Sequence, residues 1–360
     1  MNVVLLANHC NTGGITTYII TLAQGLIKQG DKVWVLSSGG DCEEILKRTG
    51  ATHVRMDIKI KSEGHPKLWA AIPQLMSFIK KNNIHIMHAQ TRVTSVMAAV
   101  ASKMTHVPYI TTCHGFFIPR LFRLMFPCWG RKVIAISAPV KDHLEIGFNV
   151  DPNKIALILN GIDSTLFAPV TTKQRDLMRE AKNITGNPVI GIIARLSTVK
   201  GIDVLIAAMP LVLQQFPNTC LWIVGQGDQE TYLKECVKKR DLTHNVKFLP
   251  AVNQTSALLP LFDVFVMPSL QEGLGLSVME AQASGVPVVA SKVGGLVDLI
   301  EDGKTGLLVS PSQHQELAAK IIIILKNPTQ AQTMATTARE RIHTLFSAER
   351  MVEETRRCYE

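Results

Sequence analysis

The feature that most constrains the fold is an alternation, along the whole chain, of short β-branched runs with longer amphipathic stretches. Continuous apolar runs of this length are typical of strands buried in a parallel sheet, and the stretches between them are typical of crossover helices. Ile15 to Gln29 shows the helical spacing most clearly, with Ile19, Leu22 and Leu26 on one face. The alternation predicts an α/β fold.

The expected strands form two sets. In the first half they are Asn2 to Ala7, Lys32 to Leu36, His85 to His88, Tyr109 to Cys113 and Val133 to Ile136. In the second half they are Val189 to Ala194, Leu221 to Val224, Val246 to Leu249, Val264 to Met267, Val286 to Ala290 and Leu307 to Val309. Two doubly wound, Rossmann-like domains facing a cleft are therefore expected, because ligands of such sheets bind at the carboxyl ends of the strands.

A polar, Thr-rich stretch separates the two sets, with Pro169 and Pro188 near its ends. The 360 residues suit two domains of about 100 to 200 residues each. We expect a first domain over 1–167, a linker over 168–187 and a second domain over 188–345.

The composition is that of an ordinary folded protein, with 46% hydrophobic and 19% charged residues. No apolar run approaches the roughly 18 residues of a membrane-spanning helix, and the first residues lack the pattern of a secretory signal, so a cytoplasmic protein is expected. Seven scattered cysteines without a Cys-x-x-Cys pair indicate reduced thiols and no structural metal site.

The net charge of +9 belongs to the first half, where residues 1–165 hold 18 Lys and Arg against 10 Asp and Glu. Such a surplus attracts nucleic acid, an anionic membrane surface or an anionic substrate. A merely soluble surface is the simpler alternative. Nucleic-acid binding explains the charge but none of the motifs below, so it is not expected.

The most informative segment is Pro268 to Ala281, which follows an expected strand and contains the turn Gly273-Leu274-Gly275 before a helix. A carboxylate on this loop, Glu272, can accept hydrogen bonds from sugar hydroxyls, and Glu280 on the helix can reach a ribose. The positive end of the helix, at Leu276 and Ser277, suits a phosphate.

A second turn, Asn11 to Gly14, lies between the first strand and the first helix. Gly13 and Gly14 would let the backbone approach a ligand there, although a purely geometric role is equally compatible. The chain lacks His-Glu-x-x-His, a Gly-x-Ser-x-Gly elbow and an Asp-x-Asp pair, which argues against metal-dependent chemistry.

The segment with Glu272 and Glu280 resembles the Glu, seven residues, Glu signature of the retaining nucleotide-sugar glycosyltransferases of family 4 (glycosyl transferases group 1), which have the GT-B fold. Other stretches agree in order and spacing: Asn160 to Asp163 with Phe167; Ala194-Arg195 with Lys200-Gly201, where Ala194 replaces the usual Gly; Val224 to Gly227; and Val288 to Gly295 with Gly303 to Gly306. The similarity covers nearly the whole chain, and residues 346–360 resemble the terminal helix that crosses back to the first domain.

The resemblance implies roles for individual residues. Arg195 and Lys200 would neutralise the diphosphate without a metal ion, Glu280 would hold the ribose, and Glu272 the donor sugar. The expected catalytic residues are His114, Glu272, Arg195 and Lys200. The expected donor-binding residues are Gly13, Gly14, Arg195, Lys200, Gly225, Glu272, Gly273, Leu274, Gly275, Leu276, Ser277 and Glu280.

Two histidines follow strands of the first domain. His114, in Thr112 to Gly115, matches the family's His-Gly position and is expected to face the donor sugar, whereas His88 is a weaker, acceptor-side candidate. Residues 116–132 combine aromatics with arginines, a pattern typical of a membrane-surface segment and equally of a core-packing helix.

The resemblance implies a retaining, metal-independent hexosyltransferase without a cofactor. Its donor would be a UDP- or GDP-linked sugar, and its acceptor a hydroxyl of a saccharide or lipid-linked molecule, in surface polysaccharide, lipopolysaccharide or glycolipid synthesis, at or near the inner face of the membrane. A nucleotide-sugar epimerase of the same fold and a non-catalytic binding subunit are the alternatives.

Overall fold

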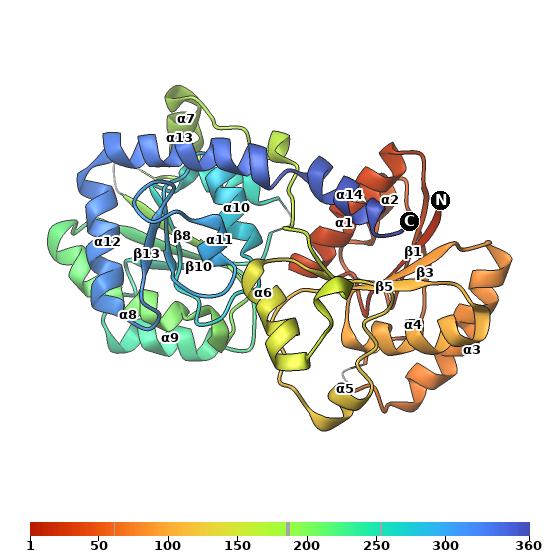
Figure 1. The fold of residues 1–360 in the computed structure, drawn as a ribbon. Helices are drawn as coiled ribbons and strands as arrows, with labels where there is room; N and C mark the ends of the chain where they lie inside the picture. Colours follow the sequence, from red (N-terminus) through yellow and green to blue (C-terminus); the bar gives the residue numbers. More distant parts are fainter. Residues whose placement is uncertain (61, 185–187, 253) are drawn as a thin grey trace. The chain divides into compact units, whose positions relative to one another are not determined.

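The computed structural model describes residues 1–60, 62–184, 188–252 and 254–360. These residues form two compact units, each built on its own sheet (Figure 1). Unit 1 comprises Met1–Gly161 and Ala348–Glu360, and unit 2 comprises Ile162–Ser347. Both sheets are parallel, as the sequence predicts.

Unit 1 holds a sheet of seven strands in the order β3-β2-β1-β4-β5-β6-β7. In chain order the strands are β1 (Asn2–Leu6), β2 (Lys32–Ser37), β3 (Thr52–Arg55), β4 (Ile86–Ala89), β5 (Tyr109–Cys113), β6 (Val133–Ala135) and β7 (Ile155–Leu157). The helices are α1 (Gly14–Lys28), α2 (Glu43–Arg48), α3 (Pro66–Lys81), α4 (Arg92–Thr105), α5 (Leu121–Met125), α6 (Ala138–Asp142) and α14 (Ala348–Arg357). The strand order reverses between β1 and β4, which is where a doubly wound sheet binds its ligand.

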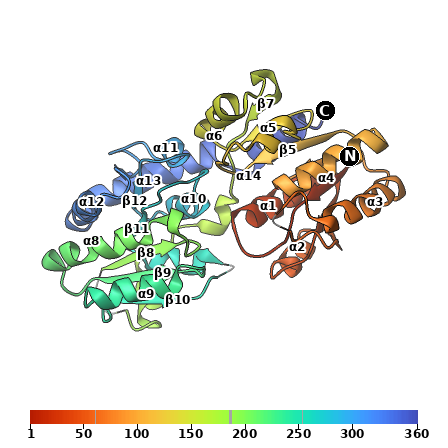
Figure 2. The same cartoon turned by 90° about the horizontal axis from the view of Figure 1, so that it is seen from below.

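Alternate residues of each strand enter two different cores, because successive side chains of a strand point to opposite faces. Val3 and Leu5 of β1 pack with α1 and α14, whereas Val4 and Leu6 pack with α3 and α4. Helices α3 and α4 lie side by side (Figure 2). Both faces of the sheet are therefore covered, which explains the uninterrupted apolar runs.

The last helix of the chain belongs to the first unit. Met351 and Val352 of α14 are buried in the same core as α1, and α14 lies directly against α1. The prediction of a C-terminal helix that returns to the first domain is confirmed.

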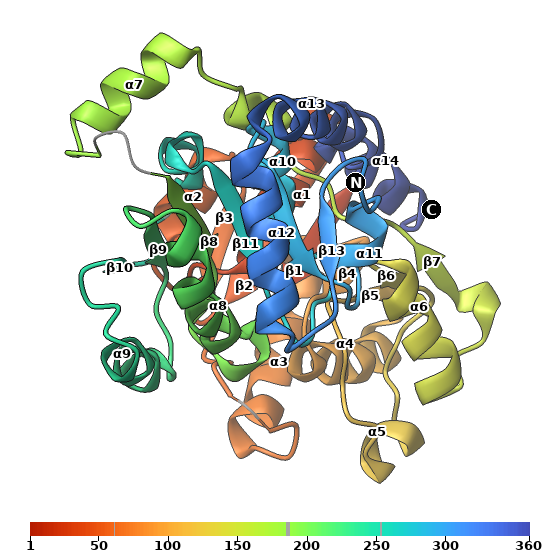
Figure 3. The same cartoon turned by 90° about the vertical axis from the view of Figure 1, so that its left-hand side faces the viewer.

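Unit 2 holds a sheet of six strands in the order β10-β9-β8-β11-β12-β13. The strands are β8 (Val189–Ile193), β9 (Cys220–Val224), β10 (Val246–Leu249), β11 (Val264–Met267), β12 (Val288–Ser291) and β13 (Leu307–Val309). The helices are α7 (Thr172–Glu180), α8 (Ile202–Gln215), α9 (Glu230–Lys239), α10 (Leu276–Ala283), α11 (Leu296–Leu299), α12 (His314–Lys326) and α13 (Pro328–Leu345). Helices α8 and α12 pack against each other over one face of this sheet (Figure 3).

Every strand expected from the sequence is present, with ends shifted by at most two residues. The two strands that the sequence did not indicate, β3 and β7, are the edges of the unit 1 sheet. Both strands are short and have no fully buried residue, so they lack the apolar run that marks a central strand.

The stretch expected as a linker, 168–187, contains helix α7. Arg175 and Arg179 of this helix both pair with Asp263 of unit 2, at 2.8 and 3.0 Å. Residues 185–187 of the stretch lie outside the described residues.

Candidate active site

The residues expected to bind or react all follow the carboxyl ends of strands, and they fall into two groups, one on each unit. In unit 2, Arg195 follows β8, Gly225 follows β9, and the segment with Glu272 follows β11. In unit 1, Gly13 follows β1 and His114 follows β5. The carboxyl end of a parallel strand is the place where such sheets hold ligands.

Two of the expected residues of unit 2 meet in an ion pair. The Lys200 Nζ atom lies 2.6 Å from Glu272 Oε2, and both side chains are largely buried, with 19% and 12% exposed. Ser269, which is fully buried, donates a second hydrogen bond of 3.1 Å to the same carboxylate oxygen. The carboxylate of Glu272 is thus held from two sides through Oε2.

Arg195 is arranged differently from Lys200. It is exposed in the loop after β8, and its guanidinium has no hydrogen-bond or ion-pair partner among the described residues. One cation of the expected pair is therefore engaged with a carboxylate, and the other is available to an incoming anion.

Glu280 lies on α10 and binds neither of these cations. Its Oε2 atom accepts a hydrogen bond of 2.8 Å from Thr255, in the loop after β10. Desolvation of the carboxyl group raises the pKa of Glu280 to about 7, and the bond from Thr255 opposes that shift. Near neutral pH the group is therefore close to half ionised.

Two glycines shape the turns around these side chains. A Cβ atom on Gly225 would lie 1.9 Å from the backbone oxygen of Ala194, so the end of β9 approaches the loop after β8 only with glycine there. Gly275 has a φ of 104° and precedes the first residue of α10, in the left-handed conformation that other residues rarely adopt.

The rest of the segment contributes mainly through its backbone. Leu274 is a core residue with 2% of its surface exposed. Gly273 closely abuts Gly295, where a Cβ atom would lie 2.3 Å from the Gly273 oxygen. Leu276 and Ser277 form the start of α10, where the first backbone N–H groups have no acceptor within the helix.

In unit 1, His114 is held by uncharged neighbours. Its Nε2 atom lies 2.9 Å from Gln90 Oε1, and the ring of Tyr18 packs edge-on against it at a centroid distance of 4.9 Å. Desolvation lowers the pKa of His114 to about 3, so its imidazole is neutral at ordinary pH.

His88 is buried completely and both of its ring nitrogens are engaged. Nδ1 lies 2.9 Å from the hydroxyl of Tyr359, and Nε2 lies 2.7 Å from Thr112 Oγ1. Thr112 also bonds the Tyr18 hydroxyl at 3.3 Å. The expectation that His88 meets an acceptor is not supported, because the side chain offers no free atom; it instead joins the C-terminal segment to the strand that carries His114.

The Gly13-Gly14 turn is exposed, and a Cβ atom on Gly13 would meet nothing within 4 Å. Asp41, in the loop after β2, fixes the residue before this turn: its carboxylate accepts from the Thr12 backbone N–H at 2.6 Å and from the Thr12 hydroxyl at 3.0 Å. The open space and the fixed backbone are compatible with ligand binding at the turn.

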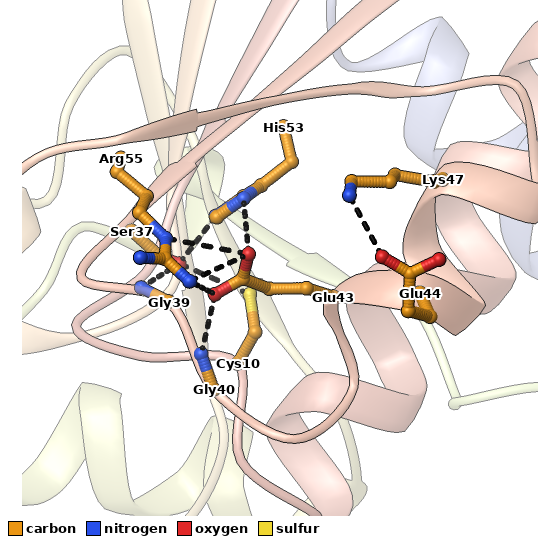
Figure 4. Close-up of polar contacts among 9 residues, drawn as sticks. All are labelled: Cys10, Ser37, Gly39, Gly40, Glu43, Glu44, Lys47, His53 and Arg55. Atoms are coloured by element: carbon orange, nitrogen blue, oxygen red, sulfur yellow. Dashed lines mark hydrogen bonds and ion pairs between the residues drawn. The ribbon is translucent and has the colours of Figure 1, made fainter.

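A polar cluster stabilises the Asp41 loop (Figure 4). The Glu43 carboxylate accepts hydrogen bonds from Arg55 at 2.9 Å and from the Gly40 N–H at 3.0 Å, and it lies 3.6 Å from His53. The other side of the His53 ring is 2.9 Å from Ser37. Glu44, the next residue, pairs with Lys47 at the surface.

These supporting residues are hardly indicated by the sequence. Ser269 lies inside the informative segment, but its contact depends on the fold of the loop. Thr255, Gln90, Asp41 and Tyr359 carry no local pattern, because each meets its partner only through tertiary structure. In the described ranges, no three His, Cys, Asp or Glu side chains gather to hold a metal ion.

The aromatic and basic segment 116–132 is largely exposed and is not a core helix. Its helix α5 buries no residue, and the exposed apolar side chains are Ile118, Leu121, Phe122, Leu124, Met125 and Phe126. Arg92 anchors the segment by bonds to the backbone oxygens of Phe126 and Pro127. No helix in the described part of the chain is long and apolar enough to cross a bilayer.

Comparisons with known proteins agree over both units. The model of Glycosyltransferase Family 4 matches residues 12–166, and that of Glycosyl transferases group 1 matches residues 173–341. An uncharacterized glycosyltransferase of Methanocaldococcus jannaschii is 26% identical, over 96% of this chain and 94% of its own length.

Two further proteins are similar in sequence or structure. A GDP-mannose-dependent monoacylated alpha-(1-6)-phosphatidylinositol monomannoside mannosyltransferase of Corynebacterium glutamicum is 34% identical, over 54% of this chain and 53% of its own length. The crystal structure of Anabaena HepE in complex with UDP-glucose superposes with a TM-score of 0.87 at 22% identity, covering 99% of each chain.

Proposed function

The chain belongs to the glycosyl transferases group 1 and has the GT-B fold, and from this premise we propose that it transfers a sugar from a UDP- or GDP-linked donor to a hydroxyl group with retention of the anomeric configuration. The observation that carries the proposal is the convergence of Lys200 and Glu272 at 2.6 Å, beside the start of α10. A cation, a carboxylate and free helix N–H groups at one strand end are the groups that a nucleoside diphosphate sugar requires.

In the proposed reaction, Arg195 and Lys200 neutralise the departing diphosphate, and no metal ion is needed for that charge. Backbone N–H groups at Leu276 and Ser277 add to the phosphate site. Glu280 accepts hydrogen bonds from the ribose hydroxyls, and Glu272 binds the sugar. Cations that are already in place when charge develops on the leaving group lower the barrier without reorganisation.

The bond changes are simple. The bond between the anomeric carbon and the β-phosphate oxygen breaks, and the acceptor hydroxyl oxygen bonds to the same face of that carbon. The leaving phosphate oxygen takes the acceptor proton. The His114 side chain contributes a hydrogen bond to a substrate hydroxyl group.

Sugar transfer itself tests the proposal. Purified protein is incubated with UDP- and GDP-linked hexoses and a panel of glycoside and glycolipid acceptors, with and without EDTA, and the product linkage is read by proton NMR. An α-linked product from an α-linked donor, formed equally with EDTA, supports retention without metal. A β-linked product overturns retention, and free interconversion of the donor without an acceptor supports the epimerase alternative.

The acceptor side is proposed to face a lipid surface through residues 116–132. Support comes from six exposed apolar side chains, with Leu121 74% and Ile118 72% exposed, interspersed with the arginines Arg120 and Arg123. Apolar side chains next to cations bind anionic interfaces by burial and by charge together.

Vesicle sedimentation tests this surface. Leu121→Ser with Phe122→Ser should reduce binding to vesicles that contain phosphatidylglycerol. The matched control, Ile146→Ser, removes an apolar side chain that is 86% exposed elsewhere in unit 1 and should leave binding unchanged. Equal binding by all variants would contradict the membrane role while leaving the transferase proposal intact.

A further inference from the structure

The His114 ring is held by two residues that come from different parts of unit 1. Gln90 follows β4 and is 2% exposed, and its Oε1 atom lies 2.9 Å from His114 Nε2. Tyr18, on α1, packs its ring at 77° to the imidazole plane. The first contact fixes the rotation of the imidazole, and the second limits its tilt.

The contact with Gln90 also determines where the proton of the ring lies. With the amide oxygen of Gln90 facing the ring, Nε2 carries the hydrogen, because an amide oxygen can only accept a hydrogen bond. The ring is neutral, because burial lowers the pKa of His114 to about 3. A neutral imidazole carries one proton, so Nδ1 is left with a lone pair. Nδ1 has no partner among the described residues.

We propose that Gln90 is a positioning residue that holds His114 in the Nε2–H tautomer, so that Nδ1 acts as an acceptor for a hydroxyl group of the substrate. This inference rests on the proposed sugar transfer. It has a consequence for substrate class: a hydroxyl can donate to Nδ1, whereas a phosphate or carboxylate oxygen cannot. A site with this acceptor should therefore favour a neutral hexose. It should disfavour a sugar that carries a carboxylate or phosphate in place of the hydroxyl group that bonds Nδ1 of His114.

The other end of the Gln90 amide is its nitrogen atom. It is buried and has no acceptor among the described residues. Reversal of the amide would only exchange this unpaired donor for an unpaired acceptor. In the reversed arrangement the nitrogen would donate to Nε2, and the ring proton would lie on Nδ1. The two arrangements thus give opposite tautomers.

The tautomer is read by ¹⁵N NMR of protein labelled at histidine, with the His114 signals assigned by their loss in His114→Gln. The expected spectrum is that of a neutral ring protonated at Nε2, unchanged from pH 8 to pH 5. A ring protonated at Nδ1, or at both nitrogens, overturns the proposal. This measurement needs no substrate, so it remains decisive even if no sugar transfer is found.

Two variants test the effect on catalysis. Gln90→Met keeps the side-chain length but removes the acceptor, and it should lower kcat by about tenfold to hundredfold with little change in the donor KM, because the tautomer is no longer fixed. Gln90→Glu restores an acceptor oxygen. Its activity should be retained at pH 8.5 and be lost at lower pH, since the carboxylate raises the pKa of His114 and promotes protonation of Nδ1.

The neighbouring titratable groups do not confuse this profile, because burial holds the pKa of His88 at about 3 and that of Tyr18 at about 12. Gln24→Met, on the half-buried part of α1, is the matched control and should leave kcat and its pH profile unchanged. A purely structural role for Gln90 predicts that kcat, measured at saturating donor, has the same pH profile in Gln90→Glu as in the wild type. That result, or full kcat in Gln90→Met, would overturn the proposal.

Discussion

Polar side chains are held differently in two regions of the molecule. One is the loop between β11 and α10 in unit 2, and the other is the surroundings of His114 in unit 1. In unit 2, charged side chains meet directly, as Lys200 and Glu272 do, and one further cation is exposed. In unit 1, neutral side chains form a buried chain from Tyr359 through His88 and Thr112 to Tyr18. Charge placed at a loop suits an anionic donor, whereas a neutral network suits the orientation of one imidazole.

The difference also determines what the sequence reveals. The charged residues of unit 2 lie in two short segments that each follow an apolar strand, Arg195 and Lys200 after β8 and Glu272 after β11. Their positions, and the resemblance of each segment, are therefore readable from the sequence. The network of unit 1 joins Tyr18 to Tyr359, and no local pattern connects residues so far apart in the chain. The sheets were predictable for a similar reason, because central strands are continuous apolar runs. Edge strands β3 and β7 have no such run.

Loss of the Lys200 charge should have the largest effect. Lys200→Met removes a cation from the proposed diphosphate site and should lower kcat/KM by about a hundredfold to a thousandfold, as for other groups that stabilise developing charge. Steady-state kinetics measure the effect. Lys234→Met is the matched control, because Lys234 forms an ion pair of the same 2.6 Å length with Glu230 but at the surface. Equal losses in the two variants would show that the charge of Lys200 has no specific role in the reaction.

Removal of the Tyr359 hydroxyl should have the next largest effect, a loss of stability in the neutral network of unit 1. Tyr359→Phe leaves His88 Nδ1 without its partner in a fully buried place, so the free energy of unfolding should fall by about 1 to 3 kcal/mol. Urea denaturation measures it. Tyr232 is 50% exposed, and Tyr232→Phe should leave the free energy of unfolding unchanged. An unchanged stability for Tyr359→Phe would mean that the network does not hold His88.

Donor binding should depend on pH through the carboxyl group of Glu280. If ionised Glu280 accepts the ribose hydroxyls, donor affinity should fall below its pKa of about 7, by up to about tenfold per pH unit. Calorimetric titration at pH 5.5, 6.5 and 8 measures the slope. Glu280→Gln should bind weakly at every pH, and Thr255→Val should move the midpoint upward, since its hydrogen bond favours the charged form. A flat profile in the wild type would contradict this role.

The same raised pKa has an opposite consequence for the stability of the free protein. The folded state holds the Glu280 proton more tightly than the unfolded state does, so this group lowers the free energy of unfolding as pH rises from about 4.5 to about 7. Glu280→Gln should flatten that part of the stability curve.

The smallest effect is expected from the Glu43 cluster. Glu43→Gln weakens the contacts to Arg55 and Gly40 and should lower the free energy of unfolding by about 1 to 2 kcal/mol. Glu44→Gln, its neighbour on α2, loses only a surface pair and should not change stability measurably. If the cluster also holds the Gly13-Gly14 turn, only Glu43→Gln should raise a substrate KM. Equal stability and equal KM in the two variants would show that the cluster supports neither the fold nor the Gly13-Gly14 turn.

The most direct test of the central claim, that unit 2 binds a nucleoside diphosphate through Lys200, is thermal unfolding of the wild type and Lys200→Met with UDP, GDP and ADP, each with and without EDTA. Specific binding raises stability by mass action, by about 2.7 kcal/mol at a ligand concentration of 100 Kd. The expected result is a rise in stability with one base, insensitive to EDTA and absent in Lys200→Met. An equal rise in both proteins, or none with any nucleotide, would contradict it.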